Sequence, residues 1–173
     1  MPRQGKITKQ NKITKQLEEE LDISIPSYSY NKKGEITFLC LFQCGVKDEH
    51  LELIGQLTSL TKLDICANQI TEIKGLENLT SLTELWLSYN KITEIKGLES
   101  LTNLTKLWLD DNIITEIKGL EALTKLSSLR LGYNRITEIK GLESLTNLTK
   151  LWVEYNKITN KEFKKINCKI YLE

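Results

Sequence analysis

The sequence predicts an α/β solenoid, with a curved parallel sheet of about seven strands and short 3-10 or helical segments on the opposite side. The first observation is a phrase that recurs every 22 residues along most of the chain. In each copy an asparagine opens the phrase: Asn68, Asn90, Asn112, Asn134 and Asn156. The second observation is a constant apolar pattern behind the asparagine. Self-similarity at a period between about 20 and 50 residues is typical of solenoids.

A leucine–x–leucine segment closes each repeat and predicts a strand. In Leu85-Trp86-Leu87, alternate side chains of an extended chain point to opposite faces, so both leucines point inward and the tryptophan points outward. One repeat cannot bury its own apolar edge. Stacked repeats share a core, with parallel strands about 4.8 Å apart.

Asparagine and glycine mark the two bends of each repeat. The asparagine side chain donates and accepts hydrogen bonds, so it can satisfy backbone groups of its own turn and of the neighbouring turn. Glycines recur on the outer bend and predict positive φ or close backbone approach. A phosphate-binding loop is disfavoured, because one glycine per repeat forms no cradle. The glycines are Gly75, Gly97, Gly119 and Gly141.

The phrase L-x-x-L-x-L-x-x-N-x-I, present from Leu104 to Ile114, resembles the leucine-rich-repeat signature. The 22-residue period with I-x-x-I-x-x-L-x-x-L, present from Ile114 to Leu123, resembles the repeats of SDS-type phosphatase-binding proteins and of internalins. This resemblance covers residues 36–172. It implies a right-handed β-α superhelix and protein partners. Those partners would be a phosphatase or GTPase for cytosolic members, and host receptors for secreted members.

Three parts follow from this pattern: residues 1–35 as an N-terminal helix and hairpin cap, 36–156 as leucine-rich repeats, and 157–173 as a C-terminal capping repeat.

The N-terminal residues are expected to form a cap that covers the open end of the solenoid. Ile13, Leu17 and Leu21 share one face of a helix expected around residues 10–22. Residues 25–44 predict a β-hairpin whose second arm is the first strand of the sheet. The alternative for the basic start of the chain is a tail that binds a membrane surface or an acidic partner.

The C-terminal part departs from the repeat. Asn160 is a candidate N-cap for a short helix that buries Phe163 and Ile166. Residues 169–172 predict a last strand, exposed at the edge of the sheet.

Composition excludes several function classes. Lys and Arg number 24 against 23 Asp and Glu, and both signs are interspersed, whereas a nucleic-acid-binding protein shows a basic stripe. No apolar run is long enough to span a membrane, and the N-terminus has no apolar signal region. The four cysteines form no C-x-x-C pair, so we expect reduced thiols and a cytoplasmic location.

Catalytic and metal-binding functions find little support. Cys44 takes the asparagine position of the first repeat and is expected to be structural. His50 is the one histidine, and we expect it at the surface of an outer segment that is a candidate short helix. No set of ligands suits zinc, and no cofactor is expected. We therefore expect a chain that is not an enzyme.

The outward positions of the strands carry the functional information. The outer phrase ITEIKGLE occurs four times, whereas the concave positions differ between repeats. All three tryptophans fall in one concave column, beside Arg130. Tryptophan, tyrosine and arginine dominate interface hot spots. The predicted partner-binding residues are Trp86, Trp108, Arg130, Trp152, Tyr89, Asp110, Asp111, Tyr133, Glu154 and Tyr155.

The function that follows is a non-enzymatic protein–protein interaction module, a scaffold or regulatory adaptor, with a macromolecular partner on its concave face. Asp110, Asp111 and Glu154 are expected to border the tryptophan column and to select a basic or polar partner. Three alternatives stay open: a tryptophan column that only stacks on itself, a homo-oligomeric structural protein, and a fragment of a secreted adhesion-type protein.

Overall fold

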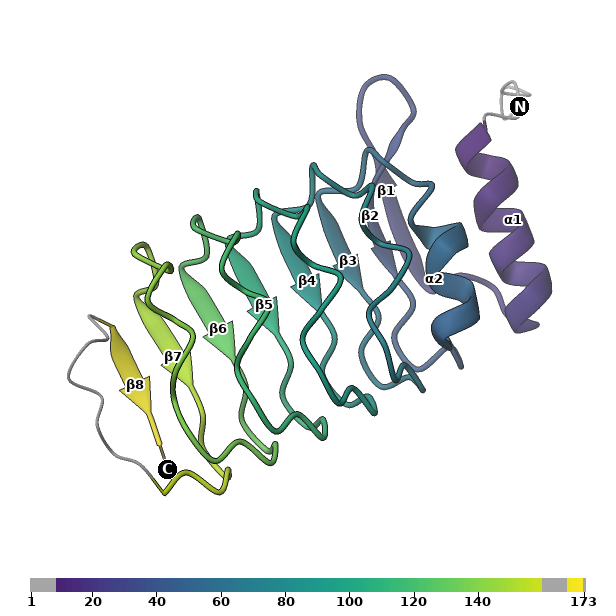
Figure 1. Ribbon diagram of the computed structural model, residues 1–173. Coiled ribbons are helices and arrows are strands. Elements are labelled where there is room, and N and C mark those ends of the chain that lie inside the picture. Colours follow the sequence, from purple (N-terminus) through teal and green to yellow (C-terminus); the bar gives the residue numbers. More distant parts are fainter. Residues whose placement is uncertain (1–8, 160–167, 173) are drawn as a thin grey trace.

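A computed structural model describes residues 9–159 and 168–172 of the chain. These residues form one solenoid, with one sheet in which the strands follow each other in chain order (Figure 1). β1 pairs antiparallel with β2, and β2 to β8 are seven parallel strands, as the sequence predicts. The elements are α1 (Lys9–Leu21), β1 (Ser27–Tyr30), β2 (Ile36–Cys40), α2 (Asp48–Ile54), β3 (Lys62–Asp64), β4 (Glu84–Trp86), β5 (Lys106–Trp108), β6 (Ser128–Arg130), β7 (Lys150–Trp152) and β8 (Lys169–Tyr171).

The parallel strands are in the register that the repeat predicts. Leu85 lies opposite Leu107, and Leu107 lies opposite Leu129. Leu107 and Leu109 are fully buried, whereas Trp108 between them faces the other side of the sheet and is half-buried. Stacked identical leucines therefore form one continuous core along the solenoid.

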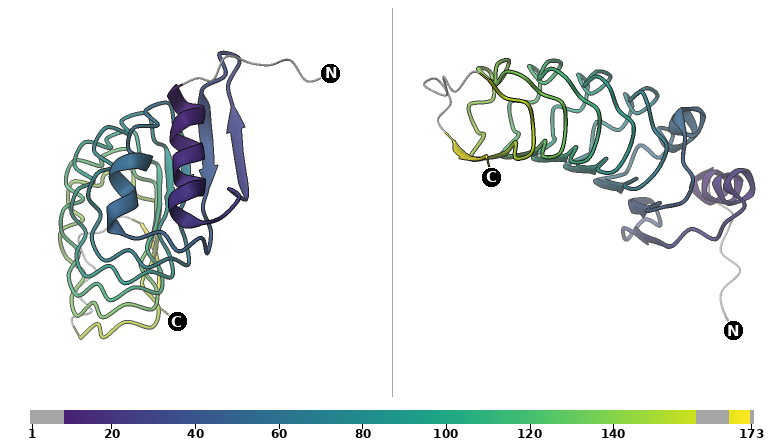
Figure 2. Two further views of the ribbon diagram at one scale, coloured as in Figure 1. Left: turned by 90° about the vertical axis from the view of Figure 1, so that its right-hand side faces the viewer. Right: turned by 90° about the horizontal axis from the view of Figure 1, so that it is seen from below.

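The outer side of each regular repeat is made of tight turns. In the repeat that follows β3, Leu79 N donates to Leu76 O at 2.9 Å and Leu82 N donates to Leu79 O at 2.9 Å. Figure 2 shows these turns on the outer side of a shallow arc and the strands on the inner side. A Cβ on Gly97, where φ is +82°, would lie 1.9 Å from Ile73 O, so close approach of the coils requires glycine here.

The repeated asparagines form a buried ladder between coils. Asn112 Oδ1 accepts from Ile92 N at 3.0 Å, and Asn112 Nδ2 donates to Leu87 O at 3.0 Å and Leu109 O at 3.1 Å. Asn134 makes the corresponding bonds one coil further. The predicted role of the asparagine is confirmed, since each amide joins backbone groups of adjacent coils.

A second ladder, which the sequence analysis missed, precedes each strand. The Thr83 hydroxyl donates to Thr61 O at 2.9 Å, and Thr105 donates to Thr83 O at 3.0 Å. Ser127 and Thr149 continue the series with bonds of 3.0 and 2.9 Å. Hydroxyl and amide ladders thus hold both ends of the strand.

The N-terminal elements cover the first end of the solenoid (Figure 1). The helix expected around residues 10–22 is α1, and its Ile13 and Leu17 are buried in the core. The hairpin is present as β1 and β2.

One expectation about this end is wrong. His50 is buried rather than at the surface, because its Nδ1 accepts the backbone N–H of Lys47 at 2.9 Å at the start of α2.

The last predicted strand is present as β8, with Ile170 opposite Leu151. The helix expected from Asn160 lies outside the described residues.

Replacing Leu109 by alanine should destabilise the fold by about 2–5 kcal/mol, because it leaves a cavity in the core. Replacing Tyr89, whose side chain is exposed, should change the free energy of unfolding by at most about 0.5 kcal/mol. Urea denaturation measures both. A larger loss from Tyr89→Ala than from Leu109→Ala would contradict the register.

Replacing Asn112 by alanine should cost about 1–3 kcal/mol, because the buried Ile92 N–H loses its acceptor. The exposed Asn78 is the matched control, and Asn78→Ala should be near neutral. Equal urea midpoints for the two variants would show that the ladder does not stabilise the fold.

Candidate functional site: the concave face

The sheet register brings the tryptophan column together. Trp86 lies beside Trp108 with ring centroids 5.0 Å apart and planes at 67°. Further along, Trp152 stacks on Tyr171 at 4.8 Å with planes at 6°. These contacts leave the three indoles half-buried. The alternative that the tryptophans stack on each other therefore describes part of their contacts, although each still presents surface to solvent.

Arg130 is fixed between the two aromatic pairs. Its Nε donates to Asp110 Oδ2 at 2.9 Å, and its guanidinium carbon lies 5.5 Å from the centroid of the Trp152 ring. Arg130 therefore makes a cation–π contact with Trp152.

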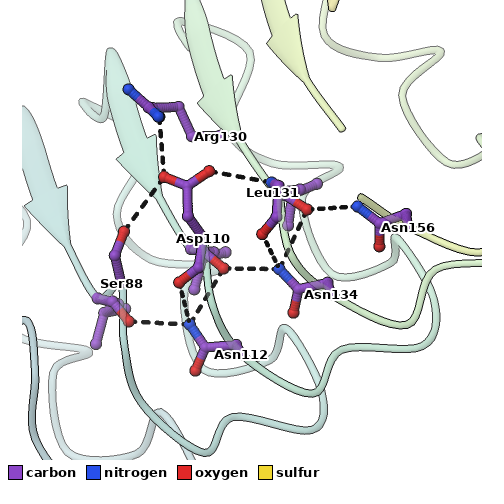
Figure 3. A network of polar contacts seen from close by, with 10 residues as sticks. Ser88, Asp110, Asn112, Arg130, Leu131, Asn134 and Asn156 are labelled. Atoms are coloured by element: carbon purple, nitrogen blue, oxygen red, sulfur yellow. Dashed lines mark hydrogen bonds and ion pairs between the residues drawn. The ribbon is translucent and has the colours of Figure 1, made fainter. Parts of the chain in front are cut away.

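Asp110 is a structural part of the surface. The sequence places it at the border with Asp111 and Glu154, but the structure shows that Asp110 is buried. Figure 3 shows its carboxylate between Ser88 and Arg130. Its carboxylate accepts from Gly132 N at 3.0 Å and from the Ser88 hydroxyl at 3.4 Å, besides Arg130. Burial raises the pKa of the Asp110 carboxyl, although Arg130 and the Gly132 N–H act against that rise.

Gly132 makes room for these carboxylates. A Cβ on Gly132 would lie 2.9 Å from Glu154 Cδ and 3.1 Å from Asp110 Oδ1. The glycine that interrupts this column therefore allows two acidic side chains to lie over the β6 coil.

Tyrosines form a second, more exposed column where the chain leaves the strands. Tyr89, Tyr133 and Tyr155 are 60%, 49% and 64% exposed. Tyr133 and Tyr155 stack with centroids 4.3 Å apart. The backbone at these positions is left-handed, with φ of 58°, 53° and 52°. Gln43, Ala67 and Asp111 hold the same conformation in the other coils.

A groove of about 550 Å³ lies on the concave face between the two columns. Its lining includes seven of the ten predicted site residues: Trp86, Tyr89, Trp108, Asp110, Asp111, Arg130 and Tyr133. Trp152, Glu154 and Tyr155 belong to the same face outside the groove. The other lining residues were not predicted from the sequence, although they lie on the strands or directly after them: Phe38, Phe42, Asp64, Cys66 and Ser88.

Within residues 9–159 and 168–172, no helix is long and apolar enough to cross a membrane. In the same ranges, no three His, Cys, Asp or Glu side chains are grouped as a metal site would require.

Stacked short parallel strands joined by an asparagine ladder define a leucine-rich-repeat solenoid. The family described as Leucine Rich repeats (2 copies) matches residues 80–122 and 124–165. The chain is a leucine-rich-repeat protein with internalin-like repeats. Comparison with curated protein sequences finds no match.

Solved structures with this fold include bacterial internalins. Internalin C2 of Listeria monocytogenes is 25% identical, with 93% of this chain and 92% of that chain covered and a TM-score of 0.55. The functional domain of InlJ from the same organism is 33% identical over 65% of this chain, with a TM-score of 0.56. A Leptospira interrogans leucine-rich-repeat protein is 38% identical over 69%, with a TM-score of 0.61. The chain spans 24% of the InlJ structure and 33% of the Leptospira structure.

The four cysteines should all alkylate in urea without reductant, because Cys40, Cys44, Cys66 and Cys168 are free thiols. In the native protein at neutral pH, Cys66 should react slowly, since burial raises the pKa of its thiol to about 12. Mass spectrometry counts the adducts, and the reduced, denatured protein is the control. Two missing adducts before reduction would reveal a disulfide.

Proposed function

We propose that the chain is a non-enzymatic interaction module whose concave face binds a macromolecular partner. The leucine-rich-repeat family supports a protein-interaction scaffold in general terms. The cytoplasmic location expected from the free thiols belongs to the same proposal.

The observation that carries the proposal is the tyrosine column. Left-handed backbone is costly for residues other than glycine, asparagine and aspartate, so large side chains are uncommon there. Tyr89, Tyr133 and Tyr155 nevertheless occupy this conformation and expose about half or more of their surface. The core gains little from these rings. Their exposure at strained positions is what a binding surface requires, because tyrosine supplies apolar contact and a hydroxyl in one rigid side chain.

The tryptophan column lies on the same concave face, and its side chains are ordered by contacts within the chain. Trp86 and Trp108 pack edge to face, and Arg130 is held by Asp110 and Trp152. Side chains that are already ordered lose little conformational entropy when a partner covers them. The concave face therefore combines a rigid aromatic floor with an exposed aromatic rim.

The divergence among repeats agrees with this assignment. Exposed lysines and glutamates of the outer phrase are the same in each copy and pair locally, as Lys96 does with Glu94 at 3.5 Å and Lys118 with Glu116 at 3.5 Å. The concave positions change from repeat to repeat although they have the same backbone. Drift alone would alter both sides equally.

The test compares two triple variants in a cross-linked pull-down from the lysate of the source organism, read by quantitative mass spectrometry. Tyr89→Ser, Tyr133→Ser and Tyr155→Ser together should remove the captured partner, since truncating a hot-spot aromatic costs about 2 kcal/mol or more of binding. The matched control replaces the outer lysines Lys96, Lys118 and Lys140 by serine and should leave capture unchanged.

Capture that is kept in the tyrosine variant would contradict the proposal, and its loss in the lysine control would assign binding to the outer side instead. Light scattering of the purified protein adds a second arm. A dimer that the tyrosine variant dissociates would identify the partner as another copy of the chain.

A further inference from the structure

We propose that the groove on the concave face holds an arginine side chain from an exposed segment of the partner protein. This inference rests on the proposed function and names the chemistry that the partner presents. Its basis is the combination of aromatic walls with carboxylates that lack a cation.

Aromatic residues are six of the twelve that line the groove. Trp86 and Trp108 lie on its floor strands, and Tyr89, Tyr133 and Phe42 lie where the chain leaves the sheet. Phe42 is 49% exposed, so its ring is also available to a partner. The faces of such rings attract cations, tryptophan most strongly.

The groove has a surplus of negative charge. Three carboxylates line it, those of Asp64, Asp110 and Asp111, against one cation, Arg130. Arg130 and Asp110 form an ion pair at 2.9 Å, so they offset each other. The charges of Asp64 and Asp111 are not offset by a cation that lines the groove.

Neither remaining carboxylate has an ion pair with another described residue. Asp64 accepts from Cys66 N at 3.0 Å and lies 3.7 Å from the Cys40 thiol. Asp111 interacts with the Tyr89 hydroxyl. Burial raises the pKa of the Asp111 carboxyl, as expected for an acid that no cation offsets.

The nearest lysine column belongs to other interactions. Lys62 and Lys106 both pair with Glu84, at 3.0 and 3.5 Å, on the opposite side of the tryptophan column from Asp111. Glu84 therefore holds two cations, whereas Asp64 and Asp111 hold none among the described residues. A basic group of the partner protein would therefore offset the charges of these two carboxylates.

The molecule itself shows why that group is arginine. Arg130 lies over the Trp152 ring and bonds the Asp110 carboxylate at the same time. A planar guanidinium can stack flat on a ring while two of its N–H groups bond one carboxylate, whereas a lysine ammonium is a point charge with neither a flat face nor a paired donor. Trp86, Trp108 and Asp111 offer rings and a carboxylate in the same groove, whereas Arg130 is engaged with Asp110 and Trp152.

The size of the groove suits a side chain with its adjoining backbone. Its volume of about 550 Å³ lies within the range of roughly 300–1,000 Å³ that is usual for ligand sites. An arginine on a loop or extended segment of a protein can be accommodated in this volume.

The test uses N-acetyl-arginine amide as the probe and N-acetyl-citrulline amide, its neutral counterpart, as the control. All three tryptophans lie on this face, so the indole N–H signals of ¹⁵N-labelled protein report binding directly. Trp86 and Trp108 should shift on titration with the arginine amide, with a dissociation constant of roughly 1–10 mM, as expected for one side chain. Trp152, which lies outside the groove, should shift much less.

Citrulline amide should bind at least about fivefold more weakly, since it lacks the charge that the carboxylates select. The double variant Asp64→Asn and Asp111→Asn should weaken arginine binding by a similar factor. Its matched control, Glu116→Gln with Glu138→Gln on the outer side, should not. Unchanged backbone signals elsewhere confirm that each variant is folded.

Equal shifts from both amides, equal shifts in the Asp64/Asp111 variant, or no shift at the solubility limit would each overturn the inference. None of these outcomes affects the proposed function, which fails only if capture of the partner survives loss of the three tyrosines. If the arginine amide binds as expected but capture survives loss of the three tyrosines, arginine binding in the groove is supported and the proposed function fails.

Discussion

Each coil of this solenoid depends on hydrogen bonds that it cannot make within itself. A chain that turns every few residues leaves backbone N–H and C=O groups pointing into the stack, where no water reaches them. An unpaired buried group of this kind costs about 1–3 kcal/mol. One asparagine per coil meets that demand, since its amide bonds backbone groups of its own coil and of a neighbour.

This requirement fixes the path of the chain at the asparagine turn. Asn112 reaches Leu87 O and Ile92 N because adjacent coils have the same path there. Asn68 makes the corresponding bonds to Leu41 O and Val46 N although α2 lengthens its coil on the outer side. The fixed path in turn places each leucine above its equivalent and each strand beside the next. Glycine at the outer bend permits that spacing, because at Gly97 a side chain would collide with Ile73 O of the previous coil.

The inward positions are therefore set by packing and by the ladders, and the outward positions are not. That division made the parallel sheet, its register and the tryptophan column predictable from the sequence. The threonine ladder was visible as a repeated Thr or Ser but was missed, because a hydroxyl before a strand has many possible partners. The burial of His50 was not predicted because it lies in the irregular first coil, at the start of α2, where the 22-residue pattern does not apply.

The properties of the site depend on contacts between columns, which a repeat alignment does not reveal. The burial of Asp110 requires Gly132 one coil away and Arg130 beside it, so no single repeat predicts it. The positive φ at Tyr89 and its equivalents likewise follows from the turn into the asparagine ladder, not from the tyrosine itself. Column membership could be predicted from the sequence, but exposure could not.

The difference in exposure changes the roles of the two aromatic columns. The sequence alone favours the tryptophans as the contact residues, yet they are half-buried against each other and against Tyr171. The tyrosines, which lie on left-handed turns, are the more exposed rings of the concave face. Because the same turns are fixed by the asparagine ladder beneath them, the tyrosine backbone is ordered before any partner arrives. The ladder that stabilises the fold thus also preorganises the surface proposed for binding, and a partner need order only the tyrosine side chains.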